Sequence, residues 1–297
     1  MLLRALALLA IATCGCAAKS EPTCDLKLLP RGTLISSGGS SGLQKTSFPD
    51  GVTSVVKHPE NYNYGGCVAQ GPPGWLIASS GTTISEVNSS TGEMVILRDG
   101  GFAVWEPISD SLVYWHGPSQ KSADQRLFVA GLHSQDAPAE ICGIPAPVPG
   151  VGNTDYYLLS KPVVLGGGRV AVLNENRELC VLDAGTVELV PTSFKDCWPQ
   201  ATRGDGKTVF CTDINTWKVF EVDVLESKKT ELPGMDGTGY IFLEGANSLL
   251  FSVSKRSLGP VPHEKTMTQV YSIGEQTKCT LETIPTINGE RTIWIPS

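Results

Sequence analysis

Few groups of residues in this chain have the types and spacing that a covalent reaction needs. Residues 38–42 read Gly-Gly-Ser-Ser-Gly and match the G-x-S-x-G pattern of a serine nucleophile. That chemistry requires the serine on a sharp turn between a strand and a helix. Here the surrounding sequence is rich in Gly and Ser, and no helix is predicted after it. We therefore interpret the match as flexible linker sequence.

A second short motif, Arg203-Gly204-Asp205, has the sequence of an integrin-type adhesion tripeptide. Gly206 follows it, and Asp-Gly between two apolar runs is an ordinary hairpin turn. The turn accounts for these residues, so we predict no adhesion site at this position.

The histidines and cysteines show no spacing that is typical of a metal site. The sequence has no Cys-x-x-Cys pair and no calcium loop of the D-x-D-x-D-G kind, and its 4 histidines are scattered. We therefore predict no metal, no cofactor and no catalytic residue. The histidines are His58, His116, His133 and His263.

Aromatic residues in loops are better candidates for recognition of a partner. Tyr62, Tyr64, Tyr156 and Tyr157 lie in loop-like sequence before predicted strands. An aromatic side chain in such a loop can anchor a binding partner. Tryptophans within strands are instead typical of core packing.

The first residues predict export. A single Arg4, an apolar run over residues 5–12 and small residues up to Ala18 form the three parts of a signal peptide. Gly15-Cys16 resembles the lipidation site of bacterial lipoproteins, which implies a lipid anchor on Cys16. The alternatives are lipidation at Cys14 and ordinary cleavage after Ala18.

These features divide the chain into three parts. We expect a signal peptide over residues 1–18, a flexible tether over residues 19–44 and a single domain over residues 45–297. The net charge of −7 argues against nucleic acid and against electrostatic docking on anionic lipid. Of the 9 cysteines, seven follow the signal region. In an exported chain these tend to form disulfides, and an odd number leaves at least one free unless it pairs with another chain.

Turn residues recur along the domain at intervals of 36, 58, 38 and 39 residues, each within the same order of short apolar strands. The longest interval includes the Pro-rich residues 137–152, which suggest an insertion between blades. A period of about 40 indicates a β-propeller of four-stranded blades, with a β-sandwich as the alternative. The length corresponds to about six blades. A strand at residues 291–296 can pair with strands near residues 26–35 and 52–56, so that both chain ends close the ring. The recurring turn residues are Gly74, Asp110, Gly168, Gly206 and Gly245.

One unit carries a recognisable pattern. Residues 204–210, Gly-Asp-Gly-Lys-Thr-Val-Phe, precede a strand that ends in Val222-Asp223. Leu182-Asp183 and the Ser-Thr-Gly-Glu hairpin at residues 90–93 are similar. These residues resemble the blades of TolB-type and WD-repeat-like propellers over about residues 66–281. The resemblance implies a propeller that binds proteins or peptides, and it assigns no catalytic residue.

We also predict a disulfide between Cys197 and Cys211. If the hairpin folds about Gly204, Cys197 lies opposite Cys211 and Trp198 lies opposite Phe210. Opposed residues at a non-hydrogen-bonded position are about 4.5 Å apart at Cα, which a disulfide can span. Two buried free cysteines are the alternative, and the register decides between them.

We therefore expect an exported, lipid-anchored propeller of the cell envelope, periplasmic or at the cell surface, or else a secreted one. It would bind a protein or an envelope component without catalysis. One alternative is a propeller-fold hydrolase or lyase with its site in the central channel, which would need a metal or paired carboxylates and histidine there. The other is a structural envelope protein. Neither the ligand nor the oligomeric state follows from the sequence.

Overall fold

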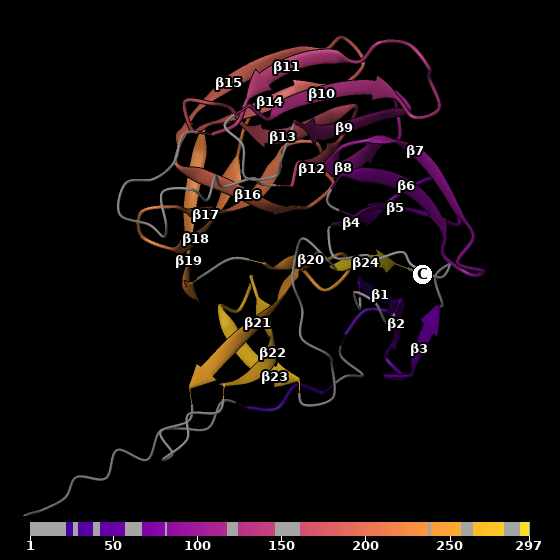
Figure 1. Cartoon of the computed structure of the whole chain (residues 1–297). Coiled ribbons are helices and arrows are strands. Elements are labelled where there is room, and N and C mark those ends of the chain that lie inside the picture. Colours follow the sequence, from indigo (N-terminus) through magenta and orange to yellow (C-terminus); the bar gives the residue numbers. More distant parts are fainter. Residues whose placement is uncertain are drawn as a thin grey trace, which may run out of the picture.

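A computed structural model describes residues 22–25, 29–37, 42–56, 67–80, 82–117, 124–145, 161–236, 239–256, 264–281 and 292–296. These residues form six four-stranded antiparallel sheets in a ring, and they include no helix (Figure 1). The prediction of a six-bladed propeller is therefore confirmed, and the sandwich alternative is wrong.

Five blades are built in the same way, from four consecutive strands that pair in order. The first strand of each lies nearest the centre of the ring (Figure 1). Blade 2 contains β4 (Val68–Gln70), β5 (Trp75–Ser79), β6 (Thr83–Asn88) and β7 (Met94–Asp99); blade 3 contains β8 (Gly101–Glu106), β9 (Ser111–His116), β10 (Arg126–Gly131) and β11 (Ala139–Gly143); blade 4 contains β12 (Val163–Gly166), β13 (Arg169–Leu173), β14 (Glu178–Asp183) and β15 (Glu188–Lys195); blade 5 contains β16 (Cys197–Thr202), β17 (Thr208–Asp213), β18 (Lys218–Asp223) and β19 (Lys228–Asp236); blade 6 contains β20 (Ile241–Leu243), β21 (Ser248–Arg256), β22 (Glu264–Ser272) and β23 (Thr277–Leu281).

The remaining blade, blade 1, is made from both ends of the chain. The C-terminal strand β24 (Thr292–Pro296) pairs with β1 (Gly32–Ser37), which continues to β2 (Leu43–Phe48) and β3 (Thr53–Val56). The expected closure of the ring is therefore confirmed.

The closing blade also corrects the boundary of the expected tether. Strand β1 lies inside residues 19–44, which we expected to be flexible. Leu34 and Ile35 are almost fully buried in the blade, and burying two such apolar side chains favours an ordered strand. The Gly/Ser-rich segment that follows connects β1 to β2, and its residues 38–41 lie outside the described residues.

The recurring turn residues all occupy the same position in their blades. Each lies in the turn between the first and second strands, and each adopts a positive φ, which Gly adopts freely and Asp more readily than most residues. Repetition of this one turn is the physical basis of the period seen in the sequence. The φ angles are 84° at Gly74, 51° at Asp110, 82° at Gly168, 80° at Gly206 and 87° at Gly245.

A second repeated turn joins the third and fourth strands. The Oδ1 atom of Asp183 accepts hydrogen bonds from the amides of Gly185 and Thr186, at 3.0 and 2.8 Å. Asp223 Oδ1 accepts equivalent bonds from Leu225 and Glu226, at 3.0 and 2.9 Å. A short side chain that accepts from the next amides is typical of Asx turns. The Leu-Asp and Val-Asp pairs that resemble TolB-type blades are therefore turn-forming residues.

The N-terminal segment extends blade 6 at its outer edge. Thr23 forms a parallel bridge with Thr280. The amide of Cys24 donates to the Thr280 carbonyl at 2.9 Å, and the amide of Thr280 donates to the Pro22 carbonyl at 2.9 Å. A disulfide between Cys24 and Cys279 holds this contact, with their Cα atoms 5.0 Å apart.

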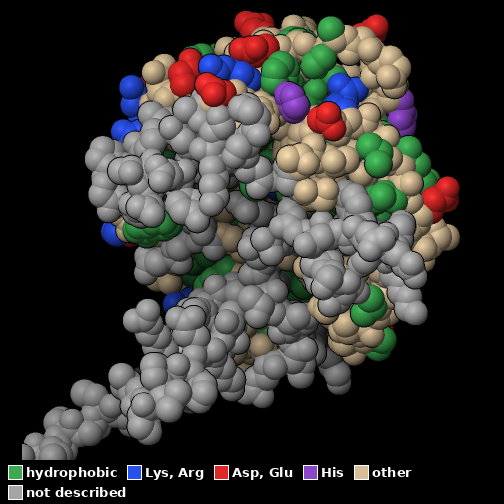
Figure 2. Space-filling model, viewed as in Figure 1, with side chains coloured by type: hydrophobic (Ala, Val, Ile, Leu, Met, Phe, Trp, Pro, Cys, Tyr) green, Lys and Arg blue, Asp and Glu red, His purple; other side chains and the backbone are tan. Residues whose placement is uncertain are grey.

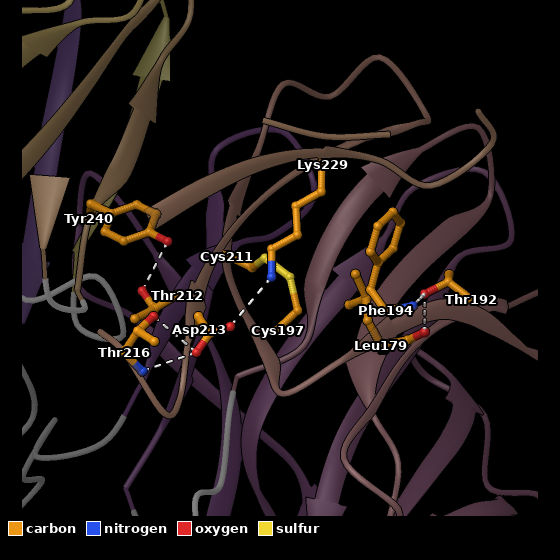
Figure 3. Close-up of a disulfide and its surroundings, with 10 residues drawn as sticks. All are labelled: Leu179, Thr192, Phe194, Cys197, Cys211, Thr212, Asp213, Thr216, Lys229 and Tyr240. Carbon is orange, nitrogen blue, oxygen red and sulfur yellow. Dashed lines mark hydrogen bonds and ion pairs between the residues drawn. A yellow bond between two sulfur atoms is a disulfide. The ribbon is translucent and has the colours of Figure 1, made fainter. Parts of the chain in front are cut away.

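A second disulfide joins Cys197 and Cys211, both fully buried, with their Cα atoms 5.4 Å apart (Figure 3). The register that we used to predict it is wrong, because Cys197 lies opposite Asp213 and Trp198 lies opposite Thr212. The hairpin is centred between residues 205 and 206, since Thr202 lies opposite Val209, and an irregularity between Pro199 and Ala201 then offsets the pairing by one residue. The shift is two residues, which leaves both cysteines on one face of the sheet.

Candidate functional site

The strongest candidate site is a cavity of about 330 Å³ in the central channel. All six blades contribute to its wall, each through its innermost strand or the residues beside that strand. Figure 1 shows these strands, β4, β8, β12, β16, β20 and β24, around the centre of the ring. The lining residues are Ala69, Gln70, Val104, Trp105, Pro107, Lys161, Pro162, Val163, Val164, Gln200, Ala201, Thr202, Ile241, Phe242, Thr292, Ile293 and Trp294.

Two aromatic side chains in the wall are held in place by their neighbours. The indole nitrogen of Trp105 donates to Asp110 Oδ1 at 2.9 Å, in the turn that follows β8. Phe242 stacks on Phe210 with ring centroids 5.4 Å apart. The Arg203 guanidinium lies 5.3 Å from the centroid of each of these two rings. The aromatic part of the wall is therefore preorganised for contact with an apolar ligand.

Two polar groups in the wall hold the blades together. Thr202 Oγ1 donates to the Val164 carbonyl at 2.6 Å, which links blade 5 to blade 4. Gln200 Oε1 accepts from the Gly239 amide at 2.9 Å, which links β16 to the residues before β20. These bonds favour a rigid channel, because the first ties inner strands of neighbouring blades and the second ties β16 to the connection that leads into β20.

The one charged side chain among the described lining residues is Lys161, directly before Pro162 and β12. Its Nζ atom donates to the Val68 carbonyl at 2.7 Å. Val68 begins β4, so the lysine reaches from blade 4 to blade 2. The lining contains no carboxylate, histidine or cysteine within the described part of the chain.

The Arg-Gly-Asp tripeptide is a structural turn. The Arg203 side chain forms an ion pair with Glu221 at 2.6 Å and also hydrogen-bonds to Asn247. Asp205 accepts hydrogen bonds from the amides of Lys207 and Thr208, at 3.0 and 2.8 Å. Burial opposes ionisation of Asp205, but the bonds from Thr208 and Lys207 outweigh it and lower the pKa of the carboxyl group. Both charged groups of the tripeptide are therefore already bound within the protein.

The structure does not bring the described histidines together. His116 borders a separate cavity of about 250 Å³ between blades 2 and 3. His133 lies on another turn, where its Nε2 atom is 3.7 Å from Glu86 Oε2. No group of three or more His, Cys, Asp or Glu residues in the described ranges could hold a metal ion.

The predicted recognition residues Tyr62, Tyr64, Tyr156 and Tyr157 lie outside the described residues, as do His58, His263 and the lipidation candidate Cys16. Sequence reasoning missed the channel residues, of which Lys161 is the most distinctive. The available signal was position, because the first strand of each repeat lines the centre of a propeller.

Acidic and basic side chains lie intermixed at the top of the surface in Figure 2, over the region of β11 and β15 in Figure 1. The residues drawn in colour there form no basic stripe of the kind that binds nucleic acid. In the part of the chain that the structure describes, no helix is long and apolar enough to cross a membrane.

Comparison with known proteins supports the fold. No family model matches the chain, and no curated protein matches it. A solved structure described as a putative TolB from Agrobacterium tumefaciens aligns with a TM-score of 0.53 and 10% sequence identity, covering 90% of this chain and 97% of that one. A chain of a nidogen/laminin complex aligns with a TM-score of 0.49 and 13% identity, covering 70% of this chain and 76% of that one. The alignment with the putative TolB confirms the predicted likeness to TolB-type propellers at the level of the fold.

Proposed function

We propose that this protein is a binding module of the cell envelope, and that it holds a segment of another protein in its central channel. The observation that carries the proposal is the cavity itself, where the innermost strands of all six blades meet in an apolar wall with fixed aromatic rings. Few, well-placed polar groups in a mostly apolar pocket are typical of ligand sites.

The composition of the wall favours binding over hydrolysis. A glycosidase uses two carboxyl groups on either side of the bond that it cleaves. Metal-assisted hydrolysis uses a bound ion to activate water, and such ions are held mainly by histidine, carboxylate or thiolate ligands. The described lining residues supply none of these groups, whereas Trp105 and Phe242 supply surfaces that suit an apolar segment.

The cysteine chemistry supports an extracytoplasmic location. Disulfides persist in oxidising compartments, and this chain has one that ties Cys24 to Cys279 and one inside blade 5. We propose that residues 1–18 direct export and that Cys16 carries the lipid that anchors the protein. A structural envelope protein with no ligand in the channel is the second candidate.

Photocrosslinking tests the proposal. A benzophenone amino acid is introduced at Trp105 in the channel wall, and irradiation is carried out in the native envelope. We expect a discrete crosslinked product with a second protein. The matched control carries the same group at Leu225, which is 61% exposed on a turn of blade 5. Equal crosslinking at the two positions, or none at Trp105, contradicts a channel site.

A further inference from the structure

We infer that the channel recognises the free C-terminal carboxylate of an extended apolar peptide, with Lys161 as its counter-ion. This inference rests on the proposed function and names the chemistry of the segment that enters the channel.

The positive charge of Lys161 in the cavity wall is the first argument for an anionic ligand. An ammonium group has three N–H donors, and the structure shows one of them bound, to the Val68 carbonyl. None of the ion pairs between described residues includes Lys161, and no carboxylate is present among the described lining residues. A cation in a mostly apolar wall is complementary to an anionic ligand group, and bonds between the two are short and strong.

The backbone around Lys161 holds the cation in position. The residue before a proline is restricted to extended conformations, and Pro162 leads directly into β12. The hydrogen bond to Val68 fixes the far end of the side chain. A preorganised ammonium loses little entropy when it binds an anion.

The apolar side chains in the rest of the wall determine which chemical groups the ligand carries beside its anionic group. Trp105, Ile241, Phe242 and Ile293 line the same cavity as Lys161, so a ligand that fills it needs an apolar body beside its anionic group. A volume of about 330 Å³ lies near the lower end of small-molecule sites, which begin at about 300 Å³. An acidic residue within a chain would require the chain to enter and leave this space. A chain end enters once and carries its own carboxylate.

Three acetylated peptides with the same apolar sequence test this inference by titration calorimetry with the full chain. The first ends in Leu-Phe with a free carboxylate. The second is the same peptide with an amidated end. The third is amidated and carries an internal Asp. We expect the free acid to bind about 10- to 100-fold more tightly than the amide, as for loss of a charge-assisted hydrogen bond. Equal binding of acid and amide, equal binding of the internal Asp peptide, or no binding of the free acid overturns the inference.

Variants of Lys161 provide a second test of the inference. Lys161→Met should abolish the preference for the free acid, while Lys161→Arg should retain most of it because the positive charge remains. Lys195→Met is the matched control, since that lysine lies on the outer strand of the same blade and pairs with Glu178 at 3.3 Å. It should leave the preference unchanged. If Lys161→Met folds and still prefers the acid, the carboxylate inference fails. The proposed function is tested independently by photocrosslinking, and it fails if the benzophenone group at position 105 gives no crosslinked partner.

Discussion

Cys24 is bonded to Cys279 at the outer edge of blade 6, beside the parallel bridge between Thr23 and Thr280. The N-terminal segment thereby covers β23, which would otherwise present unpaired backbone groups at the rim. Closure of the ring by β24 and β1 is a second link between the two chain ends. The ends of the chain are thus joined both by strand pairing and by a covalent bond.

Removing this disulfide should destabilise the fold. The crosslink closes a loop with a sequence separation of 255 residues, and a long loop gains the most from closure in the chain-entropy model. We expect Cys24→Ala/Cys279→Ala to lower the free energy of unfolding by about 2–5 kcal/mol in urea titrations. Cys67→Ala is the control, because Cys67 is a buried cysteine that belongs to neither disulfide. A double variant no less stable than this control would contradict the prediction.

A strained residue in blade 4 offers a stabilising change. Val187 has a φ of 63°, four residues after Asp183, and Gly92 holds the matching position in blade 2 with a φ of 77°. A β-branched residue is disfavoured in this left-handed region, by about 1–2 kcal/mol. We therefore expect Val187→Gly to raise the free energy of unfolding by about 1 kcal/mol and Gly92→Val to lower it by a similar amount or more. Thermal unfolding followed by circular dichroism measures both, and a less stable Val187→Gly variant would refute the argument.

The fold was predictable because its repeated turns are local. Asp183 and Asp223 bind amides only two and three residues ahead, so each blade shows its turn residues in its own short stretch of sequence. The channel was not predictable in this way. Its wall joins residues as distant as Ala69 and Trp294, and nothing in the sequence beside Lys161 indicates that it reaches Val68. The register around Cys197 was also missed, because the turn is centred after Gly204 and a local irregularity in pairing leaves no clear sequence signal.

The carboxyl group of Glu86 should make stability depend on pH. Burial raises the pKa of Glu86, and the nearby His133 only partly opposes this. Above the unfolded-state pKa, the folded state then binds more protons than the unfolded state, so stability falls as the pH rises through the raised pKa. We expect Glu86→Gln to lose less stability than the wild type between about pH 4.5 and pH 7.

Chemical unfolding at several pH values measures this difference. Glu93→Gln is the matched control, because Glu93 is an exposed residue of the same blade, and it should follow the wild type. Parallel pH profiles for the wild type and Glu86→Gln would show that burial of this carboxyl group has no effect on stability.

Arg203 should matter for stability and not for adhesion. Its guanidinium group pairs with Glu221 within blade 5 and lies over the rings of Phe210 in blade 5 and Phe242 in blade 6. The contact with Phe242 joins the two blades. Arg203→Met removes the charge but keeps an apolar side chain. The loss of stability in this variant therefore measures the contribution of the ion pair and of the contacts between the guanidinium and the rings. We expect Arg203→Met to lower the free energy of unfolding by about 1–3 kcal/mol in urea titrations, as for the loss of hydrogen bonds to charged groups. A double-mutant cycle with Glu221→Gln should show a coupling energy of at least about 0.5 kcal/mol. Additive effects, or an Arg203→Met variant as stable as the wild type, would mean that the ion pair with Glu221 does not stabilise the fold.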